Sequence, residues 1–174
     1  MVDRDQPRRV ALIGFMASGK STVGRTLAGI LGWEFADVDD LVESAAGMTI
    51  GELFRSAGEA AFRRAETSCL LGLTSRSRLV VACGGGAPMR DENLPFFTAP
   101  GTIVFYLHCP LEVALSRAEG GPAERPLLAQ GRTEAARLYA ERLPRYRALG
   151  IEIDAAAGSP REVAEAIARR TTSD

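Results

Sequence analysis

A phosphate-binding pattern lies near the start of the chain. Residues 14–21 read Gly-Phe-Met-Ala-Ser-Gly-Lys-Ser and fit the pattern G-x-x-x-x-G-K-[ST]. Glycine lets backbone N–H groups approach a phosphate closely, and the start of the following helix adds partial positive charge. Lys20 is expected to reach the β- and γ-phosphates of a nucleotide, and the Ser21 hydroxyl is expected to hold Mg²⁺. The residues expected around the phosphates are Gly14, Ala17, Ser18, Gly19, Lys20, Ser21 and Thr22.

The lysine content narrows the class of nucleotide-binding protein. Lys20 is the only lysine among 21 lysine and arginine residues. Its compact ammonium is a point charge, for which the planar guanidinium of arginine is a poor substitute. GTP-driven switch proteins usually read guanine through an N/T-K-x-D motif, which would require a second lysine. The sequence therefore argues against a GTP switch.

Two carboxylates stand at the end of the second predicted strand. Because side chains alternate along a strand, Asp37 and Asp39 are expected to project to the same side. Neighbouring carboxylates repel each other unless cations or hydrogen-bond donors hold them, and a metal-bound nucleotide with a hydroxyl-bearing acceptor would supply both. The alternative is an acidic loop that caps the following helix, and this interpretation fits Asp40 best.

Three consecutive glycines, Gly84, Gly85 and Gly86, follow the third predicted strand at its carboxyl end. Such a run allows unusual backbone angles and close approach of a ligand, and its N–H groups can bind an anion or a hydroxyl. A plain flexible turn is the competing interpretation.

The elements that must position these residues follow from the alternation of short apolar segments with helical patterns. The predicted strands are 10–13, 35–38, 79–82, 102–107 and 151–153. The predicted helices are 21–31, 41–76 with breaks near Gly47 and Gly58, 91–97, 110–117, 133–149, and a last helix capped by Ser159 that runs to Arg170. This order favours an α/β fold with a parallel sheet covered on both faces, and ligands bind beyond the carboxyl ends of such strands. The polar segment 118–132 is expected to be a mobile loop.

Composition limits the remaining possibilities. The 174 residues are expected to form a single domain, and a net charge of -1 gives no reason to expect a nucleic-acid partner. No apolar run approaches the ~20 residues of a membrane-spanning helix, and too few residues precede Val10 for a secretory signal, so we expect a cytoplasmic protein. Cys69, Cys83 and Cys109 lack metal-type spacing and are expected to be reduced thiols.

Two arginines are candidate anion-binding groups. On a helix of 3.6 residues per turn, Arg142 shares the inward, apolar side with Tyr139 and Tyr146, and a buried guanidinium needs an anionic partner. For Arg63 the residues alone leave two interpretations open with equal weight, an anion-binding role and a surface ion pair with Glu66 three residues later.

Taken together, the motifs resemble those of shikimate kinases in their order and spacing, over almost the whole chain. The segments that carry this resemblance are Gly14 to Ser21, Asp37-Val38-Asp39, Gly58 to Arg64, Gly84-Gly85-Gly86, Arg125-Pro126-Leu127-Leu128 and Glu141 to Tyr146. The resemblance implies a three-layer α/β/α fold, like that of nucleoside-monophosphate kinases, with five parallel strands in the order 2-3-1-4-5. It also implies a mobile substrate-binding region at about 34–62 and a lid at about 118–132.

The resemblance further implies a role for each matching residue in phosphoryl transfer from MgATP to the 3-hydroxyl of shikimate. Asp39 would bind the substrate hydroxyls and act as the base, and Asp37 would act near Mg²⁺. The groups implied to hold shikimate are Arg63, Arg142 and the backbone of Gly84, Gly85 and Gly86. Arg125 would swing over the transferring phosphoryl group, where exclusion of water matters because water is a competing acceptor. Arg117 would rest against adenine.

The loop 154–160, which lies opposite Arg117 in the family, offers few side-chain donors, so the strictness of the preference for adenine stays open. Two alternative functions also remain: a gluconate-type kinase, and a catalytically silent kinase-like binding protein. The pair Arg63 and Arg142 with the glycine triplet favours shikimate over gluconate, and the presence of Lys20, Ser21, Asp39 and Arg125 argues against a silent protein. A monomer is the expected state.

Overall fold

A five-stranded sheet forms the centre of the computed structural model, which describes residues 9–119 and 131–172. Its strands are β1 (Arg9–Ile13), β2 (Glu34–Asp37), β3 (Leu79–Ala82), β4 (Thr102–His108) and β5 (Ile151–Asp154). They are ordered β2-β3-β1-β4-β5, and every pair of neighbours is parallel. This confirms the predicted topology, and it brings the carboxyl ends of all five strands to one edge.

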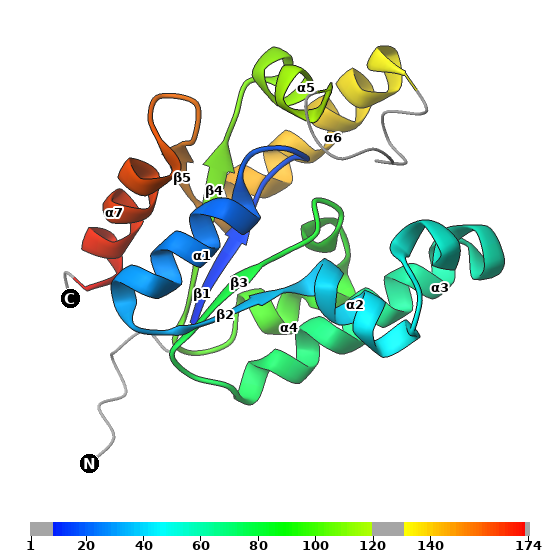
Figure 1. The fold of residues 1–174 in the computed structure, drawn as a ribbon, viewed down its shortest axis with the longest axis horizontal. Coiled ribbons are helices and arrows are strands. Elements are labelled where there is room, and N and C mark those ends of the chain that lie inside the picture. The colour runs from blue at the N-terminus through cyan, green and yellow to red at the C-terminus, as the bar shows by residue number, and fades with distance from the viewer. Residues whose placement is uncertain (1–8, 120–130, 173–174) are drawn as a thin grey trace.

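Helices cover both faces of the sheet, as the continuous apolar character of the strands predicts. Alternate residues of β1 face opposite layers: Val10 and Leu12 pack with α1 (Lys20–Leu31) and α7 (Pro160–Thr171), whereas Ala11 and Ile13 pack into the other layer. That second layer is built from α3 (Ile50–Gly72), α4 (Leu94–Phe97), α5 (Leu111–Glu119) and α6 (Arg132–Leu149). Figure 1 shows the resulting arrangement of three layers.

The segment after β2 departs in detail from the prediction. The strand ends at Asp37, and Val38 begins α2 (Val38–Ala46) instead of closing the strand. The two predicted helix breaks are confirmed. Gly47 ends α2 in the left-handed region at φ 66°, and Gly58 interrupts α3 with φ 79° and ψ 171°.

The chain after the glycine triplet is broken into short turns of helix. Two 3₁₀ helices, Ala87–Met89 and Asp91–Asn93, precede α4, so only part of the helix predicted at 91–97 is α-helical. The side chain of Asn93 is fully buried and donates to the Ala87 carbonyl at 2.8 Å. This bond fastens the segment to the end of the glycine triplet.

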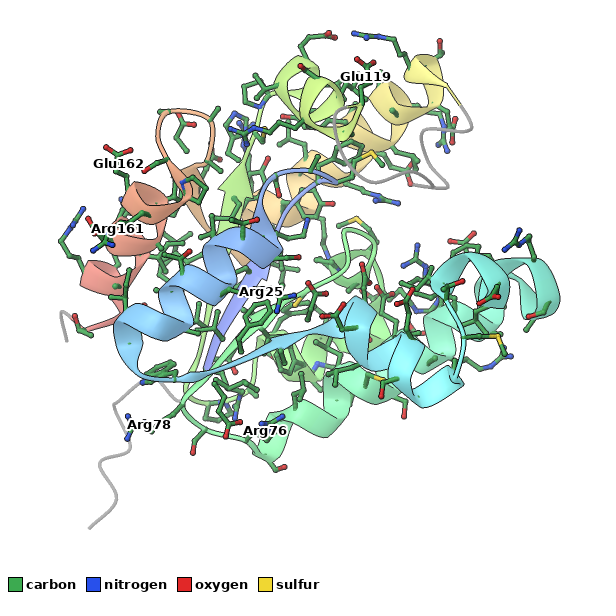
Figure 2. The ribbon with its side chains drawn as sticks, viewed as in Figure 1. Arg25, Arg76, Arg78, Glu119, Arg161 and Glu162 are labelled. Atoms are coloured by element: carbon green, nitrogen blue, oxygen red, sulfur yellow. The ribbon has the colours of Figure 1, made fainter. Side chains whose placement is uncertain are left out.

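Arg25 of α1 contacts both β2 and the start of α2 beside the acidic segment. Arg25, labelled in Figure 2, lies with its guanidinium 4.7 Å from the centre of the Phe35 ring and 3.4 Å from a carboxylate oxygen of Asp40. Asp40 is therefore an exposed partner of Arg25, and the alternative interpretation, in which Asp40 caps the helix, does not hold. Asp37 is the residue that caps α2, because its carboxylate accepts from the Asp39 N–H at 3.1 Å.

Other predictions are confirmed at the ends of elements. Ser159 caps α7 in a reciprocal pair with Glu162, labelled in Figure 2. The three cysteines are free thiols. Of the predicted mobile loop, residues 120–130 lie outside the described part of the chain, and Arg125 is among them.

Across residues 9–119 and 131–172, no helix combines the length and apolarity needed to cross a membrane.

Candidate active site

A cavity of about 880 Å³ opens at the carboxyl ends of β1, β2 and β3. It brings together most of the residues that the sequence singled out. Those that line it are Ala17, Ser18, Gly19, Lys20, Ser21, Thr22, Asp37, Asp39, Arg63, Gly84, Gly85, Gly86, Arg117 and Arg142. Gly14 does not line it, and Arg125 lies outside the described residues.

The phosphate-binding loop joins β1 to α1 in the predicted place. Ala17 and Gly19 both have positive φ, 56° and 92°, and Gly19 is the N-cap of α1. A glycine N-cap has no side chain to accept the N–H groups of the first helical turn, so these donors remain available to an anion. Gly14 serves packing, because a Cβ there would lie 2.7 Å from the Leu107 carbonyl oxygen of β4.

Lys20 lies over this loop. Its ammonium donates to the carbonyls of Phe15 at 2.8 Å and Gly14 at 3.0 Å. The charge is thus held at the entrance of α1, beside the N–H groups that an anion would contact. This position agrees with the predicted role of Lys20 at the phosphates.

Ser21 and Asp37 form the candidate magnesium site. The Ser21 hydroxyl donates to a carboxylate oxygen of Asp37 at 2.5 Å, across the gap between α1 and β2. One hydroxyl and one carboxylate fit Mg²⁺, which prefers oxygen ligands and usually takes few of them from the protein. Within the described ranges no group of three or more His, Cys, Asp or Glu side chains could hold a metal ion by itself. A metal here would therefore depend on nucleotide phosphates and water for its remaining ligands.

Asp39 lies in the same cavity, but for a different reason than predicted. Asp39 belongs to the first turn of α2 and not to the strand, so the alternation of side chains along a strand does not explain its position. The change from strand to helix at residues 37 and 38 places it beside Asp37. Burial, and then the charges of Asp37 and Glu66, raise the pKa of Asp39 to about 6, although Lys20 and Arg63 act in the opposite direction. A carboxylate with this pKa is suited to accept a proton near neutral pH.

The glycine triplet is required for space and not for unusual backbone angles. None of the three glycines has positive φ. An added Cβ would overlap a carboxylate oxygen of Glu66 at Gly84, would lie 3.4 Å from the Arg142 guanidinium at Gly85, and would lie 2.6 Å from the Arg63 guanidinium at Gly86. The sequence predicted that a ligand approaches these glycines closely. In the structure the groups that approach them include charged side chains of the protein itself.

Arg63 and Glu66 form an ion pair at 2.8 Å. It is not a surface pair, because the Glu66 side chain is fully buried and only 16% of the Arg63 side chain is exposed. Burial raises the pKa of Glu66 above its ordinary value, against the opposing effect of Arg63. Arg63 also contacts Glu59 at 3.2 Å on the solvent side. The guanidinium is therefore held at the cavity wall between two carboxylates.

Arg142 is buried, as its helical position predicts. It reaches the cavity beside Gly85 from α6. One turn later, the buried Tyr146 donates its hydroxyl to the Gly85 carbonyl at 2.6 Å. Arg63 and Arg142 thus approach the glycine triplet from two different helices, and both line the cavity.

Arg117 marks the far end of the cavity. Its guanidinium donates to the Ala155 carbonyl at 3.2 and 3.3 Å, in the loop that follows β5. Ala155, Gly158 and Pro160 of this region also line the cavity. This end is therefore bounded mainly by backbone and small side chains.

Four further residues line the cavity that the sequence did not predict there: Glu66 and the apolar side chains of Ile50, Phe54 and Phe62. A signal for Glu66 was present, because Phe62, Glu66 and Leu70 follow each other at intervals of four on the buried side of α3. A carboxylate on a buried helical stripe needs a cationic partner, which Arg63 supplies.

Comparison with known proteins agrees with this geometry. The shikimate kinase family model matches residues 16–172. The shikimate kinase of Gloeobacter violaceus is 41% identical over 88% of this chain and 86% of its own length, and that of Halorhodospira halophila is 42% identical over 92% of both. The structure of shikimate kinase from Acinetobacter baumannii in complex with shikimate is 37% identical, has a TM-score of 0.87, and covers 97% of this chain and 95% of that one. A gluconokinase from Sinorhizobium meliloti, 22% identical with a TM-score of 0.58, shares the fold. The chain belongs to the shikimate kinase family.

Proposed function

We propose that the chain transfers the γ-phosphoryl group of ATP to the 3-hydroxyl of shikimate, giving shikimate 3-phosphate and ADP. The observation that carries this proposal is the single cavity in which a phosphate-binding loop faces a buried carboxylate and two guanidinium groups. Membership of the shikimate kinase family, and a similar structure described in complex with shikimate, support the choice of acceptor.

The acceptor is bound by the side of the cavity formed by α2, α3 and the glycine triplet. Arg63 and Arg142 pair with the shikimate carboxylate, since guanidinium groups match a carboxylate in charge and geometry. Backbone of Gly84, Gly85 and Gly86 contacts the acceptor beside them. Asp39 accepts a hydrogen bond from the substrate hydroxyl and so fixes its direction.

In the reaction the 3-hydroxyl oxygen forms a bond to the γ-phosphorus as the bond to the β,γ-bridging oxygen breaks. Asp39 takes the hydroxyl proton, and ADP leaves with the electron pair of the broken bond. Lys20 and Arg125 stabilise charge on the phosphoryl oxygens. Ser21 and Asp37 hold Mg²⁺, which when bound neutralises charge on the nucleotide phosphates.

The nucleotide extends from the phosphate-binding loop toward Arg117. Adenine rests against this guanidinium and the loop after β5, where Ala155 and Pro160 offer small apolar surfaces. Region 34–62 moves when the substrates bind, so that water is excluded from the phosphoryl group. The lid predicted at about 118–132 lies largely outside the described residues. On this proposal the protein acts in the cytoplasm as a monomer.

Coupled measurement of ADP release tests this function. Purified protein is assayed with MgATP and either shikimate, gluconate or no acceptor. ADP release that depends on shikimate supports the proposal. Release that depends on gluconate would mean that gluconate is the acceptor. If a protein shown to be folded releases no ADP with either acceptor, it would be a binding protein and not a kinase.

A pair of matched variants tests the anion-binding role. Arg142→Lys is expected to raise the KM for shikimate, because a single ammonium replaces the forked guanidinium. Arg145→Lys is the control: it lies on the same helix, donates to the Pro88 carbonyl and Asp91, and does not line the cavity. Equal changes in both variants would contradict the assignment of Arg142.

A further inference from the structure

The hydroxyl of Tyr146 lies directly behind the glycine triplet. It donates to the Gly85 carbonyl at 2.6 Å, and Tyr146 has only 1% of its surface exposed. Tyr146 itself does not line the cavity, whereas Gly84, Gly85 and Gly86 do. The hydroxyl therefore contacts the triplet from within the protein, on the side of Gly85 that Arg142 also approaches.

Two features hold Tyr146 in place. Its ring stacks on Tyr106 of β4, with the ring centres 5.2 Å apart and the planes inclined by 24°. Its position is four residues after Arg142, so both side chains leave α6 on the same side and both occupy the space beside Gly85. The hydroxyl is thus supported by the central sheet and placed next to a residue proposed to bind the substrate carboxylate.

The direction of the Gly85 carbonyl determines the direction of the next N–H. All described peptide bonds are trans, and in a trans peptide the carbonyl of one residue and the N–H of the next point in opposite directions. When Tyr146 holds the Gly85 oxygen, the Gly86 N–H is fixed in the direction that points away from the Tyr146 hydroxyl. Glycine alone would leave this peptide free to rotate, because it restricts φ and ψ least of all residues.

We infer that Tyr146 is a positioning residue for the acceptor: its hydroxyl fixes the Gly85–Gly86 peptide so that the triplet is ready to receive the substrate beside Arg142. This inference rests on the proposed function. Tyr146 does not line the cavity, so it acts through the groups that its hydroxyl contacts, which are the Gly85 carbonyl and the neighbouring Arg142 guanidinium. Burial raises the pKa of Tyr146 to about 12, so the hydroxyl remains a donor across the pH range of an assay.

Tyr146→Phe tests this role, with Tyr139→Phe as the matched control. Tyr139 lies on the same helix, and its hydroxyl also donates to a backbone carbonyl, that of Cys109 at 3.2 Å. Both variants keep the ring and lose one side chain-to-backbone hydrogen bond. Tyr146→Phe is expected to raise the KM for shikimate about tenfold, a factor that corresponds to ~1.4 kcal/mol, while the KM for MgATP changes less than about twofold. Tyr139→Phe is expected to leave the KM for shikimate within about twofold.

The outcomes separate this inference from the function on which it rests. A wild-type protein without shikimate-dependent activity overturns the proposed function. An active wild type together with a folded Tyr146→Phe whose KM for shikimate is unchanged overturns the role of Tyr146, as does an equal rise in both KM values.

Hydrogen exchange on the wild-type protein tests the same point without a variant. If Tyr146 orders the loop in advance, the Ala87 amide, which donates to the Gly84 carbonyl at 3.0 Å across the triplet, is already protected in the free protein and gains little protection when shikimate is added. Fast exchange that becomes slow only with shikimate would show that the substrate orders the loop, and the inference would be wrong.

Discussion

Replacement of Asp39 by asparagine is expected to stabilise the protein while it removes most of the turnover. Asp39 is ionised at neutral pH although it is largely buried near two other carboxylates, those of Asp37 and Glu66. Asparagine has nearly the same shape and carries no charge, so the repulsion and the cost of burying a charge both disappear. The same change removes the proposed proton acceptor.

The size of the effect follows from the pKa. The pKa of Asp39 rises from 3.8 to about 6 on folding, and each pKa unit corresponds to about 1.4 kcal/mol. Ionised Asp39 therefore lowers the free energy of unfolding by at most about 3 kcal/mol, and partial access of solvent reduces this to ~1–2 kcal/mol. Because the raised pKa means that the folded state binds the proton more tightly, stability falls as pH rises from about 4 through about 6, and the full deficit remains above that range.

Urea unfolding of wild type and Asp39→Asn between pH 4 and pH 8 measures this difference. The variant is expected to gain little at pH 4 and ~1–2 kcal/mol above pH 7. Asp40→Asn is the matched control, since Asp40 is the next acidic residue and its exposed side chain pairs only loosely with Arg25 at 3.4 Å. Its effect should be small at every pH.

Two results would refute this reasoning. One is an Asp39→Asn protein that is less stable than wild type at pH 8. The other is a difference in stability that does not change between pH 4 and pH 8, because a constant difference would arise from packing and not from the charge.

Three further predictions concern the same cavity. Gly84→Ala is expected to lower the free energy of unfolding by about 2 kcal/mol and to weaken shikimate binding, because the new methyl group meets Glu66. Urea unfolding measures the first effect and calorimetry the second. Unchanged values would show that Glu66 can move aside. Glu66→Gln is expected to raise the KM for shikimate, because it removes the charge that holds Arg63; kinetics that match wild type would contradict this. The kcat/KM for shikimate is expected to fall about tenfold per pH unit below pH 6, as the base Asp39 becomes protonated, and a profile that stays flat to pH 5 would exclude Asp39 as that base.

Much of the fold was predictable because its signals are local. The apolar segments of β1 and β3 and the helical pattern between them indicate a parallel sheet without any long-range information. The glycines that end or break helices, Gly47 and Gly58, also act through their own backbone angles. The phosphate-binding loop could be placed for the same reason, since strand, loop and helix are consecutive.

The parts of the site that were missed or misread depend on contacts between distant segments. Gly84 meets Glu66 of α3, and Gly85 meets Tyr146 of α6, so the reason for each glycine lies outside its own segment. The misread end of β2 has a different cause. An apolar Val38 between two acidic residues fits a strand pattern as well as a first helical turn, and the hydrogen bond from the Asp39 N–H to Asp37 favours the helix.

The parallel order of the sheet has a consequence for how activity appears during folding. Arg9 of β1 pairs with Leu79 and also with Thr102, so each strand that ends at the cavity finds its neighbour only after a long stretch of chain has been synthesised and ordered. Pairings so remote in sequence form slowly and late. A partly folded chain can therefore have helices before the cavity is assembled, and on dilution from urea the regain of catalytic turnover should trail the regain of helical circular dichroism.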